Sequence, residues 1–227
     1  MSGFPFLKYR GGKLFVESVS LDQISQEFGT PCYVYSRAAL TNAYRELDAA
    51  FSERNHLLCY AVKANSSLAI LDLFARLGSG FDIVSEGELR RVLKVGGDPQ
   101  KIVFSGVGKS PVEIRAALLA NILCFNVESE AELVLLNQIA KEMDKIAPVS
   151  MRVNPDVDAK THPYISTGLK ENKFGVPFNE AEKLYFSGEN LTNIRMTGLD
   201  FHIGSQLTEL APFSEACEKV LGLLDRC

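Results

Sequence analysis

The sequence has no tryptophan, only three histidines, and five cysteines that stand singly along its 227 residues. No C-x-x-C pair occurs, so a zinc knuckle is excluded, and five widely spaced cysteines do not form a disulfide framework. The histidines show no H-E-x-x-H pattern, and we predict no metal site. Cysteines of this kind are typical of a reducing compartment, which predicts a cytoplasmic protein.

A basic block and long hydrophobic runs are also missing. Lys and Arg number 24 against 28 Asp and Glu, a net charge of −4, and both signs are mixed along the chain. We therefore expect no nucleic-acid partner. No stretch approaches the roughly 20 apolar residues that a membrane span needs, and residues 1–10 lack the pattern of a signal peptide, so we expect neither membrane insertion nor export.

The sequence does contain a repeated alternation of short runs rich in Val, Ile and Phe with longer segments of helical period, such as 68–77 and 86–95. This alternation predicts an α/β fold with a parallel sheet. The strand starts lie roughly 20–26 residues apart, close to the spacing of a (β/α)8 barrel. Capping boxes are predicted for the helices that follow Ser85 and Ser129. The six predicted strands are 57–63, 81–84, 101–104, 122–125, 148–153 and 195–201.

The chain divides into an N-terminal extension and a barrel portion. Residues 1–35 predict a strand at 15–17, a helix at 21–28 and a second strand at 33–35, and residues 36–227 hold the repeated units. The region 154–177 is rich in Pro, Gly, Asp, Thr and Lys, and a loop of that length in a compact domain is usually functional.

Two charged residues are candidates for chemistry in the first predicted strands. Lys63 ends a strand in which the small Ala61 lies behind it, and a desolvated lysine there could form a Schiff base. The alternative is a solvated lysine that merely terminates the strand. Asp82 lies inside a buried strand, where a carboxylate needs a compensating cation. Its alternative is a turn or capping residue, although Ser85 already fills that role.

Two later strands also end in polar residues. Arg152 could bind an anion, but a structural salt bridge is equally compatible with the sequence. His202 is followed by Gly204 and Ser205, whose backbone amides and hydroxyl could hold a phosphate while the imidazole stacks on a flat cofactor. The alternative for His202 is an ordinary core or surface histidine.

Together, six segments resemble the diaminopimelate decarboxylase family, which belongs to the fold-type III pyridoxal phosphate enzymes with an alanine racemase-like (β/α)8 barrel. The resemblance runs from about Phe4 to the end of the chain. The segments are YAVKAN at 60–65, GFDIVSEGEL at 80–89, MRVNPD at 151–156, THPYISTG at 161–168, NKFGV at 172–176 and GLDFHIGSQ at 198–206.

This resemblance implies pyridoxal 5'-phosphate as cofactor and an amino-acid substrate. Family members remove the carboxylate at the D-configured centre of meso-2,6-diaminopimelate, giving L-lysine and carbon dioxide in the last step of lysine biosynthesis, and act as homodimers. By the resemblance, Lys63 would be the catalytic lysine, bonded to the cofactor's aldehyde. The other implied cofactor-binding residues are His202 on the pyridine ring, Gly204 and Ser205 on the phosphate, Asp82 beside the lysine and ring, and Arg152 near the ring.

The sequence departs from the family because it stops inside the helix after the sixth strand. We therefore expect a barrel truncated by two strands. The family's E-x-G-R segment, the carboxylate facing the pyridine nitrogen and the C-terminal β-domain would be absent, and Cys217-Glu218-Lys219 is not that domain's Cys-Glu-Ser motif. The extension would pack with the missing domain, and the fragment alone would be inactive.

Two other functions remain open. A related decarboxylase of ornithine, arginine or carboxynorspermidine would share the candidate residues, although 154–156 and 162–168 favour diaminopimelate. A non-catalytic pyridoxal phosphate-binding protein has a complete barrel at about this length. Such a protein needs eight strands, whereas this sequence predicts six and an extension.

Overall fold

The computed structural model describes residues 5–157, 174–205 and 207–227. Most of the proposed loop at 154–177, including the THPYISTG segment at 161–168 and the start of NKFGV, lies outside the described residues, as does Gln206.

Six parallel strands form one curved sheet, in the order β10-β8-β7-β6-β5-β4. This confirms the α/β prediction and all six predicted strands. Among the described residues β4 and β10 are not paired with each other, so the barrel is not closed. The bounds are β4 Cys59–Ala61, β5 Gly80–Ile83, β6 Ile102–Phe104, β7 Cys124–Val127, β8 Ala147–Asn154 and β10 Ile194–Asp200.

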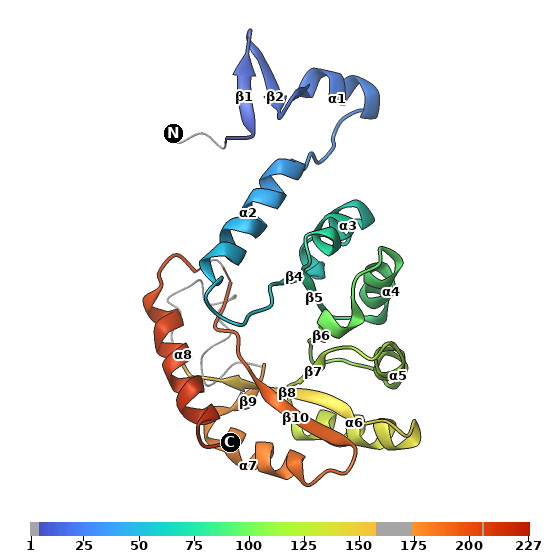
Figure 1. Cartoon of the computed structure of the whole chain (residues 1–227), viewed down its shortest axis with the longest axis vertical. Helices are drawn as coiled ribbons and strands as arrows, with labels where there is room; N and C mark the ends of the chain where they lie inside the picture. Colours follow the sequence, from blue (N-terminus) through green and yellow to red (C-terminus); the bar gives the residue numbers. More distant parts are fainter. Residues whose placement is uncertain (1–4, 158–173, 206) are drawn as a thin grey trace.

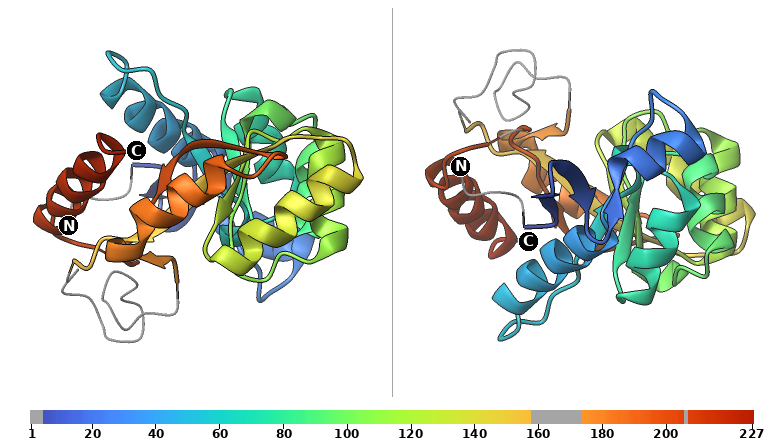
Figure 2. Two further views of the ribbon diagram at one scale, coloured as in Figure 1. Left: turned by 90° about the horizontal axis from the view of Figure 1, so that it is seen from below. Right: turned by 90° about the horizontal axis from the view of Figure 1, so that it is seen from above.

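Helices alternate with these strands. Figure 1 shows α3 to α6 together on one side of the curved sheet, and both views of Figure 2 place α8 on the side away from α4 and α5. Short 3-10 turns, η1 Val62–Ala64 and η2 Pro99–Lys101, flank β4 and β6. The helices are α3 Leu68–Arg76, α4 Glu86–Lys94, α5 Pro111–Ala120, α6 Glu130–Glu142, α7 Phe178–Glu189 and α8 Ala211–Leu224.

The core lies between the sheet and α3 to α6. Phe81 and Ile83 on β5 are fully buried with the apolar faces of these helices, while Asp82 between them is half-buried. The same alternation recurs on β7, where Phe125 and Val127 enter the core and Asn126 does not. Because side chains alternate across a strand, the apolar face packs on the helices and the opposite face carries polar groups.

Serine side chains begin the helices as predicted, but the capping boxes differ in detail. Ser85 and Ser129 accept hydrogen bonds from the third residue of their helices. The glutamate at that third position reaches one residue further back, to the amides of Val84 and Glu128. The reciprocal bond of a full capping box instead occurs in α5, where Glu113 bonds the backbone of Ser110.

The N-terminal extension forms a small separate sheet of β1 Leu7–Arg10, β2 Lys13–Val16 and β3 Val19–Ser20, followed by α1 Leu21–Phe28. Figure 1 shows it at one end of the long axis, joined to the barrel portion by α2 Arg37–Ala50. Neither α1 nor α2 buries a residue. The predicted strand at 33–35 is wrong: these residues are exposed and have no neighbouring strand to complete a ladder.

β9 Val176–Pro177 was not predicted, because it has only two residues and lies in a loop-like sequence. It pairs in parallel with the end of β8. In the part of the chain that the structure describes, no helix is long and apolar enough to cross a membrane.

Candidate active site at the carboxyl edge of the sheet

The carboxyl ends of the parallel strands place most predicted site residues at one edge. Ala61, two residues before Lys63, is in register with Asp82 on β5. At the other side of the sheet Asp200 on β10 is in register with Arg152 on β8. In barrel enzymes this edge carries the active site.

Lys63 lies on η1, directly after β4 rather than within it. The strand alternation ends at Ala61, so the prediction of a strand lysine is wrong by two residues. Lys63 is also exposed, which differs from the desolvated lysine that we expected. Its amine acts electrostatically on both Asp82 and His202, and Asp82 is in register with Ala61, two residues before Lys63.

Asp82 has the compensation that its position in a buried strand demands. Ser105 donates a hydrogen bond of 2.6 Å to its Oδ1. Burial raises the pKa of Asp82, and the Ser105 hydroxyl, Lys63 and Arg152 oppose that rise. Asp82 is therefore not the cap of α4, since Ser85 fills that role, and it stays a candidate site carboxylate.

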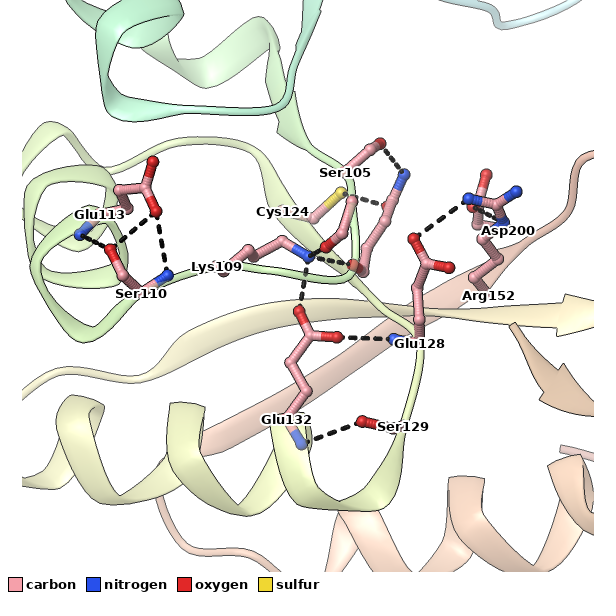
Figure 3. A network of polar contacts seen from close by, with 12 residues as sticks. Ser105, Lys109, Ser110, Glu113, Cys124, Glu128, Ser129, Glu132, Arg152 and Asp200 are labelled. Atoms are coloured by element: carbon pink, nitrogen blue, oxygen red, sulfur yellow. Dashed lines mark hydrogen bonds and ion pairs between the residues drawn. The ribbon is translucent and has the colours of Figure 1, made fainter. Parts of the chain in front are cut away.

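Arg152 is held between two carboxylates. Its Nη1 lies 3.1 Å from Glu128 Oε1, and its Nε lies 4.0 Å from Asp200 Oδ2. The guanidinium also stands 5.5 Å from the centre of the Phe174 ring. Figure 3 shows Glu128 pointing toward the guanidinium, with Asp200 beside it. Arg152 therefore forms the salt bridge that the sequence left open as an alternative. Its positive charge also acts on Asp82 and His202.

Asp200 and His202 respond to this crowding of charges in different ways. Burial raises the pKa of Asp200 to about 6, and Arg152 only partly offsets this rise. The pKa of His202 is lowered, first by desolvation and then by the positive charges of Arg152 and Lys63. Near neutral pH the imidazole is therefore the uncharged form, which suits a stacking surface.

Gly204 and Ser205 follow His202 beyond the end of β10. Gly204 is buried and has φ +143°, a conformation that side-chain-bearing residues rarely adopt. Ser205 is exposed. Gly204 lacks a side chain that would keep an anion away from the backbone, and the exposed Ser205 offers a hydroxyl that can donate a hydrogen bond.

A buried ion pair beneath the edge was not predicted. Lys109, with 2% of its side chain exposed, lies 2.5 Å from Glu132 Oε1 and also bonds the carbonyls of Gly106 and Asn126. Figure 3 shows the Lys109 side chain reaching toward Glu132 on α6. The three donors of the ammonium are thereby used, and this lysine ties the loop before α5 to β7 and α6.

Sequence reasoning therefore missed five polar residues of the site. Asn126 and Asp200 carried a signal, because each interrupts an apolar alternation near the end of a strand. Lys109 and Ser105 lie in loops whose partners come from other units of the repeat, and no local pattern marks them. The missed residues are Ser105, Lys109, Asn126, Glu128 and Asp200.

The donor set at this edge fits pyridoxal phosphate. The cofactor presents an aldehyde, a flat aromatic ring and a phosphate. Lys63 offers an exposed primary amine, His202 offers a planar uncharged ring, and Ser205 with the Gly204 backbone offers hydrogen-bond donors. Among the described residues, no group of three His, Cys, Asp or Glu side chains could hold a metal ion.

Comparisons with known proteins identify the family of this chain. The family model described as "Pyridoxal-dependent decarboxylase, pyridoxal binding domain" matches residues 37–227. Diaminopimelate decarboxylase of Haemophilus influenzae is 58% identical over 221 residues, which are 97% of this chain and 53% of that protein.

Two solved structures are similar to the fold. Helicobacter pylori diaminopimelate decarboxylase complexed with L-lysine has a TM-score of 0.88 and 48% identity, over 90% of this chain and 52% of that one. Lysine decarboxylase from Selenomonas ruminantium has a TM-score of 0.78 and 26% identity, over 90% and 50%. The chain thus spans about half the length of these relatives. Since the family model covers most of its length, the chain belongs to the pyridoxal-dependent decarboxylases, and residues 37–227 are their pyridoxal-binding domain.

Proposed function

We propose that this chain carries the cofactor-binding half of a diaminopimelate decarboxylase, which converts meso-2,6-diaminopimelate to L-lysine and carbon dioxide. The observation that carries the proposal is the position of Lys63, Asp82 and His202 at the carboxyl ends of β4, β5 and β10, which is one edge of the sheet. The high identity with the Haemophilus influenzae enzyme favours this substrate.

Bound pyridoxal phosphate supplies an electron sink for the pair of electrons left behind when carbon dioxide departs. The work of the chain is to hold that group and to set the charges around it. We assign Lys63 as the catalytic residue that bonds the aldehyde. His202 supports one face of the ring, and Gly204 with Ser205 binds the phosphate.

Asp82 and Arg152 set the electrostatics of the site. Asp82 offers a negative charge to the Lys63 amine, and Ser105 keeps the carboxylate oriented. Arg152 is clamped by Glu128 and reaches toward Asp200, so it supplies a fixed positive charge near the ring. A fixed charge needs no reorganisation during the reaction, which is the general advantage of a preorganised site.

A decarboxylase of ornithine, arginine or carboxynorspermidine is the second candidate, because the fold and the cofactor residues do not discriminate between these substrates. The 58% identity with the Haemophilus influenzae diaminopimelate decarboxylase argues against it. A non-catalytic pyridoxal phosphate carrier is disfavoured because the identity with that decarboxylase extends over 97% of this chain.

We also propose a cytoplasmic homodimer, in which residues 1–35 pack against the part of the relatives that this chain does not match. This packing is supported by the large apolar side chains that the extension exposes, among them Tyr9, Phe28 and Tyr33. Residues that cover these side chains would explain why α1 buries nothing within the chain.

The test is a substrate comparison with the complete protein and pyridoxal phosphate. Release of carbon dioxide is measured with meso-diaminopimelate, ornithine, arginine and carboxynorspermidine, and L-lysine is identified as the product of the first. We expect turnover of meso-diaminopimelate well above that of the other three. Preferred turnover of ornithine or arginine would contradict the assignment, and cofactor binding without turnover of any substrate would indicate a carrier.

A further inference from the structure

Ser105 lies directly after β6, where its side chain meets the carboxylate of the neighbouring strand. Its Oγ is 2.6 Å from Asp82 Oδ1, and its backbone amide donates to the carbonyl of Ile83 at 2.8 Å. The residue is half-buried. The backbone amide and the side-chain hydroxyl of Ser105 are therefore both bonded to β5, and the hydroxyl is held beside Asp82.

Asn126 determines the direction of this hydrogen bond. Its Nδ2 lies 3.0 Å from Ser105 Oγ, while its Oδ1 faces the Cys124 thiol at 3.7 Å. An amide nitrogen can only donate, so Ser105 accepts from Asn126. The single hydroxyl proton of Ser105 is then directed to the one remaining partner, the Asp82 carboxylate.

The buried ion pair below holds Asn126 in turn. Lys109 Nζ donates to the Asn126 carbonyl at 2.7 Å and to the Gly106 carbonyl at 2.7 Å, and it lies 2.5 Å from Glu132 Oε1. Asn126 itself is buried. The hydrogen bonds thus run in one line from Glu132 through Lys109, Asn126 and Ser105 to Asp82.

We propose that Ser105 is a positioning residue for the reaction: it aims the Asp82 carboxylate at the space in front of Lys63, and Asn126 sets the direction of its hydroxyl. The inference rests on the proposed function, because Asp82 needs a fixed orientation only if a cofactor occupies that space. Ser105 itself touches Asp82 and not the reacting groups.

Several titratable groups surround Asp82 besides the Ser105 hydroxyl, and they come from different elements. Burial raises the pKa of Asp82, and the Ser105 hydrogen bond is the largest effect that lowers it. Removing the hydroxyl leaves all the other groups in place, so the pKa of Asp82 must rise. These groups are Lys63 after β4, Cys59 on β4, Glu88 on α4, Lys109 before α5, Cys124 on β7, Arg152 on β8 and Asp200 on β10.

The experiment titrates the absorbance of pyridoxal phosphate bound to the complete protein as a function of pH, without substrate. Asp82→Asn identifies the acid-side transition that depends on Asp82. In Ser105→Ala we expect that transition to move to higher pH by about one unit, the size of a lost charge-assisted hydrogen bond. Ser105→Cys keeps the shape with a weaker donor and should shift it by less, and Ser105→Thr should restore the wild-type midpoint.

Ser187→Ala is the matched control, because this serine is exposed on α7, an element that carries none of the candidate site residues. Its midpoint should equal that of the wild type. Equal midpoints in Ser105→Ala and the wild type would overturn the inference, as would a midpoint in Asp82→Asn that does not differ from the wild type. A wild-type protein that does not bind pyridoxal phosphate would instead contradict the proposed function itself.

Discussion

At the scale of single residues, Lys63 carries the strongest prediction. Lys63→Ala should abolish covalent capture of pyridoxal phosphate by the complete protein, because Lys63 supplies the amine that faces Asp82 and His202. Borohydride reduction followed by peptide mapping measures the capture. Lys101→Ala is the matched control, since that amine bonds the Gly78 carbonyl at the start of β5 instead. A pyridoxyl group on Lys101 in the wild type would refute the assignment.

His202 should matter for the cofactor and not for the fold. The residue is exposed, so His202→Ala removes little packing, while the lost stacking surface should weaken cofactor binding by about 1 kcal/mol. Cofactor titration and thermal melting of the apo-protein are compared. His56→Ala, at a half-buried histidine that is bound to Asp48, should leave the affinity unchanged. A large loss of apo stability with unchanged affinity would mean that His202 is a structural residue.

Asp200 makes stability depend on pH. Its carboxyl has a pKa near 3.8 when unperturbed and about 6 in the fold, because burial disfavours the charge. The unfolded chain therefore ionises first, and this group lowers stability as pH rises through that window. Asp200→Asn should remove this decrease in stability with rising pH. The melting temperatures of the variant and the wild type, measured at several pH values, test this. Glu189→Gln on the surface should leave the profile unchanged, and an unchanged profile in Asp200→Asn would show that the carboxyl titrates normally.

The sequence indicated Lys63, Asp82, Arg152 and His202 because each ends or interrupts a strand with a polar side chain, and the structure places them at one edge. The partners that fix them were harder to predict. Glu128 follows β7 and forms an ion pair with Arg152 on the neighbouring strand β8. Its burial depends on tertiary packing, which no local sequence pattern encodes. The exposed position of Lys63 on a 3-10 turn could not be predicted either, because the alternation of side chains does not show at which residue a strand ends.

At the scale of elements, the contact between β4 and β5 depends on the absence of a side chain at Gly80. A Cβ there would lie 2.5 Å from the Lys101 carbonyl and 2.7 Å from Cys59 Sγ. Gly80→Ala should therefore destabilise the complete protein by roughly 1–3 kcal/mol.

Gly222→Ala is the matched control for this contact. Gly222 lies in α8, and an added Cβ meets no atom within 4 Å. The variant should gain about 0.5–1 kcal/mol of stability, because alanine favours a helix interior. Denaturant unfolding of both variants measures the difference, and equal stabilities would contradict the packing described for β4 and β5.

The repeated units were predictable because each strand and helix carries its own periodicity and capping serine. The extension was predicted less well. β1 and β3 were missed because they are short and contain few apolar residues; each pairs with β2. Residues 33–35 were wrongly predicted as a strand because their side chains favour strands, but no strand lies beside them. A strand requires a partner, and the presence of a partner is a property of the tertiary structure.

At the scale of the whole molecule, residues 1–227 alone should show no measurable decarboxylase activity. The parallel sheet has open edges at β4 and β10, which expose backbone groups and invite aggregation or a complementing chain. The relatives are about twice as long, so Lys63 and His202 would act without the contacts that the other half supplies. Weak capture of pyridoxal phosphate without turnover is the expected limit.

The measurement is carbon dioxide and L-lysine released from meso-diaminopimelate by purified residues 1–227 with added pyridoxal phosphate. The Haemophilus influenzae enzyme serves as the positive control, because it is 58% identical over the shared region and about twice as long. Lys63→Ala in the fragment should lose the weak cofactor capture, which separates specific binding from adsorption to exposed apolar surface. Turnover by a soluble, monomeric fragment would show that residues 1–227 contain all the groups that catalysis needs, and that closure of the barrel is needed only for stability.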